Sequence, residues 1–225
     1  MLGTSLPVRS LSDRASSAPH AMPSQATPLR SEHDPGPSAP PVLKAPLLTT
    51  AAMLLLTAVL LRFAGQDAWC ECGRLSLWEG DIWSSHNSQH PIDPYFFSHV
   101  LHGVLFCGCL SLLPKSCSHS LRFTLAVALE CGWELLENSP LVIERYRTAT
   151  LALDYYGDSI TNSMFDILAC MLGYAFAALT TRVKSLLLLL LSELLMTLAI
   201  RDCLTLNILM LLYPVEAIKQ WQLPS

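Results

Sequence analysis

Three acidic side chains recur at helical spacing within one apolar stretch of the chain. Glu130, Glu134 and Glu137 are spaced i, i+4 and i+7, which places all three carboxylates on one face of a helix. Glu130 lies about 12 Å along such a helix from Asn138, at the polar end of the stretch, because each residue adds about 1.5 Å. Ionised groups at that depth need partners, so they are candidates for function.

Other apolar stretches carry polar residues at the same helical spacing. These are His99 and His102; Asp158, Asn162 and Asp166; and Glu193, Thr197 and Arg201. Residues spaced by three or four share one face of a helix. We expect these polar faces to converge on one pocket.

Imidazole and carboxylate groups together suit Zn, Fe or Mn, so the sequence predicts a site for a divalent metal. The predicted ligands are His99, His102, Glu130 and Asp166. A bound ion would lower the pKa of a coordinated water and support hydrolysis. The predicted catalytic residues are Glu134, as general base, with Glu130 and Asp158. Asp158 has a competing structural interpretation, since an aspartate at a helix start caps backbone N–H groups.

Two other interpretations of the polar faces stay open. The sequence contains no HExxH, Cys-x-x-Cys or Gly-x-Ser-x-Gly motif. Hydrogen bonds between such side chains can simply fix helix packing, as in a scaffold or assembly factor. A transporter or proton path also uses intramembrane carboxylates, although no polar path continues below Glu130 on its helix. Whether the chain is an enzyme is therefore open from sequence.

The elements that would position these residues are apolar runs of membrane-spanning length. A helix needs about 20 residues to cross a hydrocarbon core of about 30 Å. Five runs approach that length: Leu47 to Phe63, Phe96 to Leu113, Leu121 to Glu137, Ser159 to Thr180 and Leu186 to Ile200. A shorter run, Leu204 to Tyr213, fits a re-entrant segment or a short sixth crossing. The sequence predicts an all-α, polytopic membrane bundle of five or six transmembrane helices.

Composition agrees with a lipid-facing surface. Of the 225 residues, 52% are hydrophobic and 14% are charged, whereas a soluble domain carries about 25% charged residues. The net charge of -4 and the lack of a basic stripe argue against a nucleic-acid partner. The lipid bilayer is the predicted partner, and protein partners are not indicated.

Domain organisation and orientation follow from proline, serine and charge. Residues 1–44 are rich in Pro and Ser and are predicted to be a disordered N-terminal extension, followed by a membrane domain at 45–225. Lys44 precedes the first apolar run, Lys115 and Arg122 lie between the second and third, and Arg182 and Lys184 lie between the fourth and fifth, whereas the 64–95 segment is acidic. Basic loops stay in the cytoplasm, which predicts a multi-pass inner-membrane protein with a cytoplasmic N-terminus.

Aromatic residues and cysteines add two smaller expectations. Trp69, Trp78, Trp83 and Tyr95 fit an aromatic belt at a membrane interface. Most of the eight cysteines lie in apolar runs, where cysteine acts as a small hydrophobe. Cys70 and Cys72 are the pair whose polar surroundings suit metal binding or oxidation, although a disulfide between them would be strained.

Several ordered motifs resemble a known family. They are Cys70 to Gly73 (CECG), Ser85 to His90 (SHNSQH), Ser98 to Gly103 (SHVLHG), Trp133 to Pro140 (WELLENSP), Glu144 to Arg147 (ERYR), Leu153 to Ser163 (LDYYGDSITNS) and Ile200 to Leu212 (IRDCLTLNILMLL). Over roughly residues 45–222 the chain resembles a bacterial multi-pass membrane family, domain of unknown function 2585 or uncharacterised protein family 0314. The resemblance implies several spans in a bacterial cytoplasmic membrane, and it implies no activity, substrate or cofactor.

Together these features predict an inner-membrane protein with a polar, metal-binding pocket near the periplasmic face. We expect a membrane-embedded hydrolase of lipid or envelope substrates, with a non-enzymatic scaffold as the main alternative and a transporter as a weaker one.

Overall fold

The computed structural model describes residues 44–150 and 155–223, and in these ranges the regular structure is entirely helical. The helices are α1 (Lys44–Ala64), α2 (Phe96–Leu110), α3 (His119–Glu137), α4 (Pro140–Ala149), α5 (Ile160–Leu179), α6 (Arg182–Ile200), α7 (Leu204–Leu212) and α8 (Glu216–Gln222). The 65–95 segment between α1 and α2 has only an isolated bridge, Trp78 to Ile92. The predicted all-α class is confirmed. The predicted extension at 1–44 lies outside the described residues, apart from Lys44.

Hydroxyl side chains fix where four of the helices begin. The side chains of Ser118, Ser139, Ser159 and Thr181 each accept a hydrogen bond from the backbone N–H three residues ahead. Such a cap satisfies one of the N–H groups that have no partner within the helix. Pro140 follows one cap at the first helical position, where its missing N–H costs nothing.

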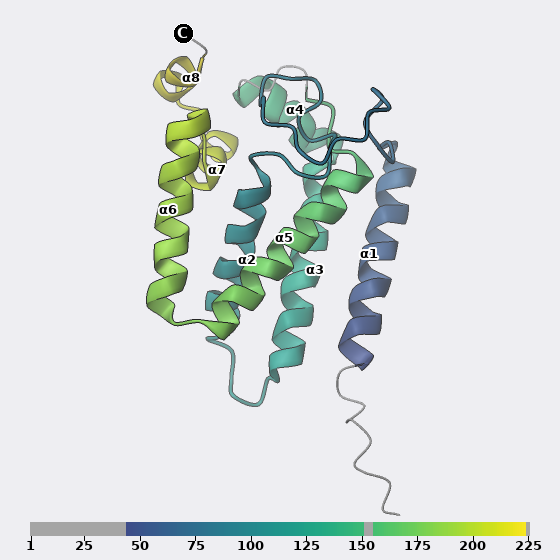
Figure 1. Cartoon of the computed structure of the whole chain (residues 1–225), viewed down its shortest axis with the longest axis vertical. Coiled ribbons are helices and arrows are strands. Elements are labelled where there is room, and N and C mark those ends of the chain that lie inside the picture. The colour runs from purple at the N-terminus through teal and green to yellow at the C-terminus, as the bar shows by residue number, and fades with distance from the viewer. Residues whose placement is uncertain (1–43, 151–154, 224–225) are drawn as a thin grey trace, which may run out of the picture. The chain divides into compact units, whose positions relative to one another are not determined.

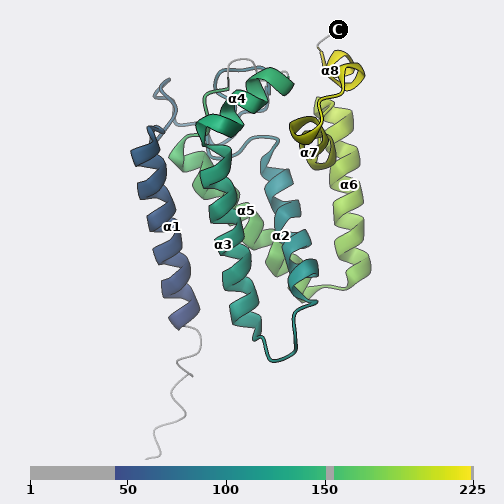
Figure 2. The ribbon, with the colours of Figure 1, turned by 180° about the vertical axis from the view of Figure 1, so that it is seen from behind.

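Five long helices lie alongside one another, and the shorter elements gather at one end. Figures 1 and 2 show α4, α7, α8 and the 65–95 segment at one end of α1, α2, α3, α5 and α6. We call this the loop end. At the opposite end, α2 connects to α3 and α5 turns into α6 (Figure 1). The polar residues that begin α2 and α5 and end α3 therefore meet at the loop end.

An apolar core lies between α1, α3 and α5. Val127, Cys131 and Ile167 are buried there, and the side chains packed against them include Met53, Phe123 and Met164. Two of the helices that form this apolar core, α3 and α5, also carry the buried acidic residues Glu130 and Asp166. The core holds the helix faces that carry them in fixed register.

Three helices are long and apolar enough to cross a membrane, fewer than the five or six predicted. They are Leu47–Ala64, Ile160–Leu179 and Arg182–Ile200. The run from Phe96 ends as a helix after 15 residues, and α3 carries the three glutamates that lower its hydropathy. The nine residues of α7 extend about 14 Å, which is too short to cross a core of about 30 Å. The sequence analysis also missed α4 and α8.

The α6 helix shows how much apolar surface stays uncovered. Met196 is its one buried residue among 19, while Leu190, Leu194 and Leu198 are more than half exposed. An exposed apolar surface of this size indicates contact with lipid or with another apolar partner.

Candidate functional site

Both histidines of α2 contact the same carboxylate of α3. His99 Nδ1 lies 2.6 Å from Glu130 Oε1, and His102 Nδ1 lies 3.1 Å from both oxygens of Glu130. Glu130 is completely buried, so its oxygens are satisfied by hydrogen bonds from these two rings and not by water. Donation from Nδ1 in each ring leaves both Nε2 atoms available for a further ligand.

A second group of carboxylates also lies against His99. His99 Nδ1 is 3.4 Å from Glu134 Oε1, and His99 Nε2 is 3.9 Å from Asp166 Oδ2. Glu134 is completely buried and Asp166 is 4% exposed. Both oxygens of Glu134 and Oδ1 of Asp166 lack a hydrogen-bond partner among the described residues. Buried carboxylate oxygens without partners are expensive, which indicates that a proton or a cation belongs beside them.

A third group brings carboxylates together without a histidine. Glu134, Glu137 and Asp158 each place an oxygen within 4.8 Å of the others. The Tyr146 hydroxyl donates to Glu137 Oε1 over 3.0 Å, and the Tyr155 hydroxyl donates to Asp158 Oδ1 over 3.0 Å. Three such acids cannot all be ionised at this distance without a compensating positive charge.

Asp158 is held from α3 and is poised to titrate near neutrality. Asn138 Nδ2 donates to Asp158 Oδ2 over 2.9 Å, and the backbone N–H of Asp158 donates back to Asn138 Oδ1 over 2.6 Å. Burial raises the pKa of Asp158 to about 6, against the opposing effect of the hydrogen bonds from Asn138 and Tyr155. The alternative prediction that Asp158 caps a helix was wrong, because Ser159 caps α5.

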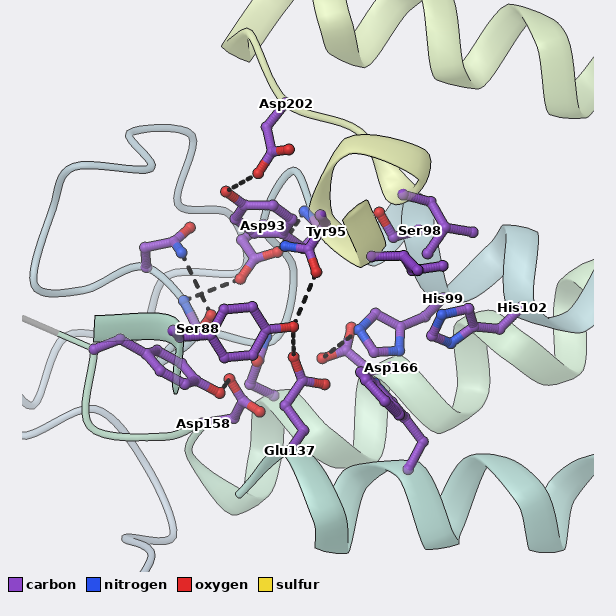
Figure 3. Close-up of a pocket in the computed structure, with 18 of the residues that line it drawn as sticks. Ser88, Asp93, Tyr95, Ser98, His99, His102, Glu137, Asp158, Asp166 and Asp202 are labelled. Carbon is purple, nitrogen blue, oxygen red and sulfur yellow. Dashed lines mark hydrogen bonds and ion pairs between the residues drawn. The ribbon is translucent and has the colours of Figure 1, made fainter. Parts of the chain in front are cut away.

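These groups border a cavity of about 630 Å³ at the loop end. Figure 3 shows His99, His102, Asp166, Glu137 and Asp158 directed toward it from α2, α3, α5 and the turn before α5. One part of its wall is polar, and the other is formed mainly by Leu105, Phe106, Leu129, Trp133, Leu136 and Ile208. Glu130 and Glu134 are not among its lining residues, since both are completely buried behind it. The cavity therefore suits a molecule with a polar head and an apolar body.

The sequence analysis missed several polar residues of the cavity wall. Asp93 accepts hydrogen bonds from the backbone N–H groups of Ser88 and Tyr95, and burial raises its pKa. The Tyr95 hydroxyl donates to Asp202 Oδ2 over 3.1 Å, so this tyrosine lines the cavity as well as beginning α2. The Asp-Pro pair before an apolar run was a readable helix-start signal, but nothing in the local pattern joins Tyr95 to Asp202.

The polar stripe of α6 does not join the cluster. Glu193 Oε2 accepts from the backbone N–H of Thr205 over 3.1 Å. Arg201 donates to the carbonyl oxygens of Trp221 and Leu223 over 3.2 and 2.7 Å. These residues fasten α7 and α8 to the end of α6.

The structure divides the ligand set predicted from sequence. His99, His102 and Glu130 form one group, whereas Asp166 joins His99 and Glu134 in another. Glu134 also joins Asp158 in the third group, with Glu137. All six metal-binding and catalytic residues predicted from the sequence thus lie in one connected cluster. His99 and Glu134 each belong to two of its three groups.

The fold and the cluster define a class: an all-helical bundle with apolar helices of spanning length and a buried histidine and carboxylate cluster at one end. Within that class the chain belongs to the DUF2585 family, described as protein of unknown function, whose model matches residues 61–224. The family resemblance read from the motifs is confirmed.

Proteins named UPF0314 are similar over most of their length. One from Rhizobium etli is 48% identical over 171 residues, which cover 76% of this chain and 88% of the relative. One from Paracoccus denitrificans is 44% identical over 178 residues, covering 79% and 92%. One from Brucella anthropi is 44% identical over 175 residues, covering 78% and 89%. No solved structure matches the chain.

Proposed function

We propose that this chain is a multi-pass inner-membrane hydrolase that uses one divalent metal ion, Zn, Fe or Mn, to act on a lipid-like or envelope substrate. The observation that carries the proposal is the set of buried, unpartnered oxygens on Glu134 and Asp166 beside His99. A purely structural network would satisfy such atoms with hydrogen-bond donors. A cation satisfies all of them at once.

The ion is assigned to His99, Glu134 and Asp166. Glu130 contacts Nδ1 of His99 at 2.6 Å, which fixes the ring and leaves Nε2 toward Asp166. Carboxylates commonly orient metal-binding histidines from behind in this way. His102 is held by the same Glu130 and lines the cavity, so it is placed to contact the substrate.

The general base in this proposal is Asp158, in place of the Glu134 predicted from sequence. A base must reach the water that it deprotonates, and Asp158 lines the cavity whereas Glu134 does not. The two residues place oxygens within 4.8 Å of each other, a distance that one water bridges. A pKa near 6 lets Asp158 accept a proton and return it at neutral pH.

The reaction is the addition of water across an ester bond. A metal ion held by His99, Glu134 and Asp166 would lower the pKa of a water beside it, and Asp158 would take the proton of that water. The resulting hydroxide attacks the electrophilic carbon or phosphorus of the ester. The bond to the departing oxygen breaks, and that oxygen receives the proton from Asp158.

The membrane arrangement in this proposal includes α2 and α3 in addition to the three apolar helices. Support comes from the burial of Glu130 and Glu134, which face the other helices and leave the surface of α3 apolar where Leu121 and Leu125 are exposed. The 65–95 segment lies on the periplasmic side and the α2–α3 connection in the cytoplasm, as the charge pattern favours.

Accessibility of introduced cysteines tests this arrangement. Asp81→Cys and Lys115→Cys replace exposed residues in the two connections. They are placed in a background with Cys70, Cys72, Cys109 and Cys117 changed to Ser, to reduce labelling of native thiols. A membrane-impermeant maleimide added to intact spheroplasts should label the first variant and not the second. Labelling of the second variant alone would reverse the topology, and recovery of the chain in the soluble fraction would refute membrane insertion.

Metal analysis of the purified full-length protein in detergent tests the site. We expect Glu134→Gln and Asp166→Asn each to lose one equivalent of metal relative to wild type. Glu144→Gln, which changes an exposed acid of α4, is the matched control and should retain it. Equal metal content in all four proteins, with lower thermal stability of the two cluster variants, would establish the structural network instead.

Hydrolysis is tested with membrane lipids extracted from the native bacterium. Mass spectrometry should show products that form with wild-type protein and not with Asp158→Asn, which keeps the fold contacts of Asn138 and Tyr155. Products that form equally with Asp158→Asn would show that Asp158 is not the general base. If wild-type protein binds the ion but produces no change in any lipid or envelope extract, the hydrolase assignment fails.

A further inference from the structure

Two cysteines and two histidines meet in the 65–95 segment, away from the cavity cluster. Cys70, Cys72, His86 and His90 each offer one ligand atom, and these four atoms lie within 4.8 Å of one another. Cys70 Sγ is 3.2 Å from His86 Nδ1, and Cys72 Sγ is 3.7 Å from His90 Nε2. All four residues come from a segment without helices, so helix packing does not explain why they converge.

The distances match the ligand shell of zinc. Zinc binds thiolate sulfur at about 2.3 Å and imidazole nitrogen at about 2.0 to 2.1 Å in a tetrahedron, so adjacent sulfur and nitrogen ligands lie about 3.6 Å apart. The two observed sulfur-to-nitrogen distances lie on either side of that value. Two thiolates with two imidazoles form one of the recurrent closed zinc sites. The spacing of His86 and His90 is within its usual range, and the spacing of Cys70 and Cys72 is one residue shorter than usual.

The four side chains are otherwise poorly partnered. His90 Nδ1 is buried without a hydrogen-bond partner among the described residues. Cys70 and Cys72 are free thiols, and Cys70 is only 5% exposed. The backbone N–H of Arg74 lies 3.5 Å from Cys72 Sγ, where it would donate to a thiolate. Both thiols and both rings are thus available to an ion.

Hydrogen bonds attach the segment to the start of α5, but it has little apolar core of its own. It is about 30 residues long without regular structure, and Leu75, Leu77, Trp78 and Trp83 are exposed on it. Long irregular segments seldom hold one conformation without a core of their own. A structural metal supplies folding free energy where apolar burial cannot.

We propose that Cys70, Cys72, His86 and His90 bind one zinc ion in a closed, structural site. The ion fixes the 65–95 segment on the start of α5, where the Asn162 side chain donates to the carbonyl oxygen of His90 over 2.8 Å. Ser88 lies between the two histidines and lines the cavity together with Asp93, so the site holds part of the cavity wall in place. None of the four ligands belongs to the histidine and carboxylate cluster, and this site stands whether or not that cluster binds metal.

Cobalt substitution of the full-length protein in detergent tests the proposal. Protein stripped with a chelator and reloaded with Co²⁺ should show thiolate-to-cobalt charge transfer in the near ultraviolet and intense tetrahedral bands in the visible. Added Zn²⁺ should abolish both. The double variant Cys70→Ser/Cys72→Ser should lose the signal.

The chain offers a matched control with the same spacing. Cys107→Ser/Cys109→Ser removes two thiols from α2 and should leave the spectrum unchanged, since neither thiol belongs to the proposed site. Glu134→Gln should also leave it unchanged, which separates this site from the cavity cluster. Absence of a thiolate band in wild-type protein, or its persistence in Cys70→Ser/Cys72→Ser, would overturn the proposal.

A second measurement needs no variant. Arg74 is exposed between the cysteines and the histidines, so trypsin can cleave after it. Zn²⁺ should slow cleavage at Arg74 by at least tenfold relative to chelator-treated protein, because the ordered segment no longer fits the protease. Equal cleavage rates, or a Cys70–Cys72 disulfide found by mass spectrometry of protein purified with thiols blocked, would refute a closed zinc site.

Discussion

Gly103 on α2 and Gly173 on α5 each lie directly against the backbone of the other's helix. A Cβ atom on Gly103 would overlap the carbonyl oxygen of Cys170, and one on Gly173 would overlap the carbonyl oxygen of Val100. Small residues let membrane helices approach this closely. Because His99 lies one turn from Gly103 on the same helix, the two glycines set how near His99 can come to Asp166 on α5.

Alanine at either glycine should therefore destabilise the protein strongly. We expect Gly103→Ala or Gly173→Ala to cost about 2 to 4 kcal/mol, because the clash is with backbone that cannot rotate away. Gly108→Ala, also on α2, meets nothing within 4 Å and should be neutral or gain up to about 1 kcal/mol of helix stability. Thermal unfolding in one detergent measures all three. Equal midpoints for Gly103→Ala and Gly108→Ala would show that the two helices do not pack at this distance.

Asp202 should make stability depend on pH. Burial raises its pKa to about 6, well above the usual value of about 3.9, even though the backbone N–H of Cys203 and the Tyr95 hydroxyl donate to it. The folded state therefore binds a proton more tightly than the unfolded chain. Proton binding at Asp202 therefore stabilises the folded state. This stabilisation is fully present below about pH 4 and is lost as the pH rises through 6.

The variant Asp202→Asn, which keeps an acceptor for Tyr95, isolates this effect. We expect it to be more stable than wild type at pH 8 by up to roughly 2 to 3 kcal/mol, with a smaller advantage at pH 5. Unfolding midpoints of both proteins in the same detergent and salt provide the comparison. A difference that stays constant between pH 5 and pH 8 would contradict a raised pKa for Asp202.

The stability of the protein should depend on both the charge and the size of the side chain at position 138. The Asn138 side chain donates to Asp158 Oδ2 and accepts from the backbone N–H of Asp158. Asn138→Ala should cost about 1 to 3 kcal/mol, because it leaves both groups unsatisfied in a buried site. Asn138→Asp should cost more at pH 8, since it sets two carboxylates side by side.

Measurement at low pH shows whether charge repulsion or side-chain shape destabilises Asn138→Asp. At pH 5 the paired carboxylates can share a proton, so this variant should recover relative to Asn138→Ala. Thermal unfolding followed by circular dichroism at pH 5 and pH 8 measures this recovery. No recovery at pH 5 would mean that shape, and not charge, determines the identity of residue 138.

The sequence predicted the helices that carry the site because their apolar runs and spacing are local properties. The predicted starts at Phe96 and Leu204 agree with the helices observed, and i, i+4 spacing correctly placed Glu130 and Glu134 on one inward face. The α4 helix was missed because Arg145 and Arg147 interrupt any apolar pattern there. Fewer helices than predicted are long and apolar enough by themselves to cross a membrane, because α2 is short and the inward-facing glutamates lower the hydropathy of α3.

Contacts between distant segments could not be read in the same way. Helical spacing says which face a residue occupies but not which partner it meets, so it did not separate Asp166 from the group of His99, His102 and Glu130. The meeting of Cys70 and Cys72 with His86 and His90 depends on the path of an irregular segment, which has no periodicity to analyse. The pairing of Tyr95 with Asp202 likewise spans 107 residues of chain.

The apolar part of the cavity wall has a consequence for how a substrate would arrive. Ile200, Leu204 and Ile208 extend the apolar part of the wall at the end of α6, a helix with many exposed leucines. An amphipathic molecule dissolved in the bilayer would then enter sideways, by diffusion in two dimensions, and never pass through water. Its turnover would follow its mole fraction in the membrane, so diluting it with an inert lipid would slow the reaction even when the total amount per volume stays the same.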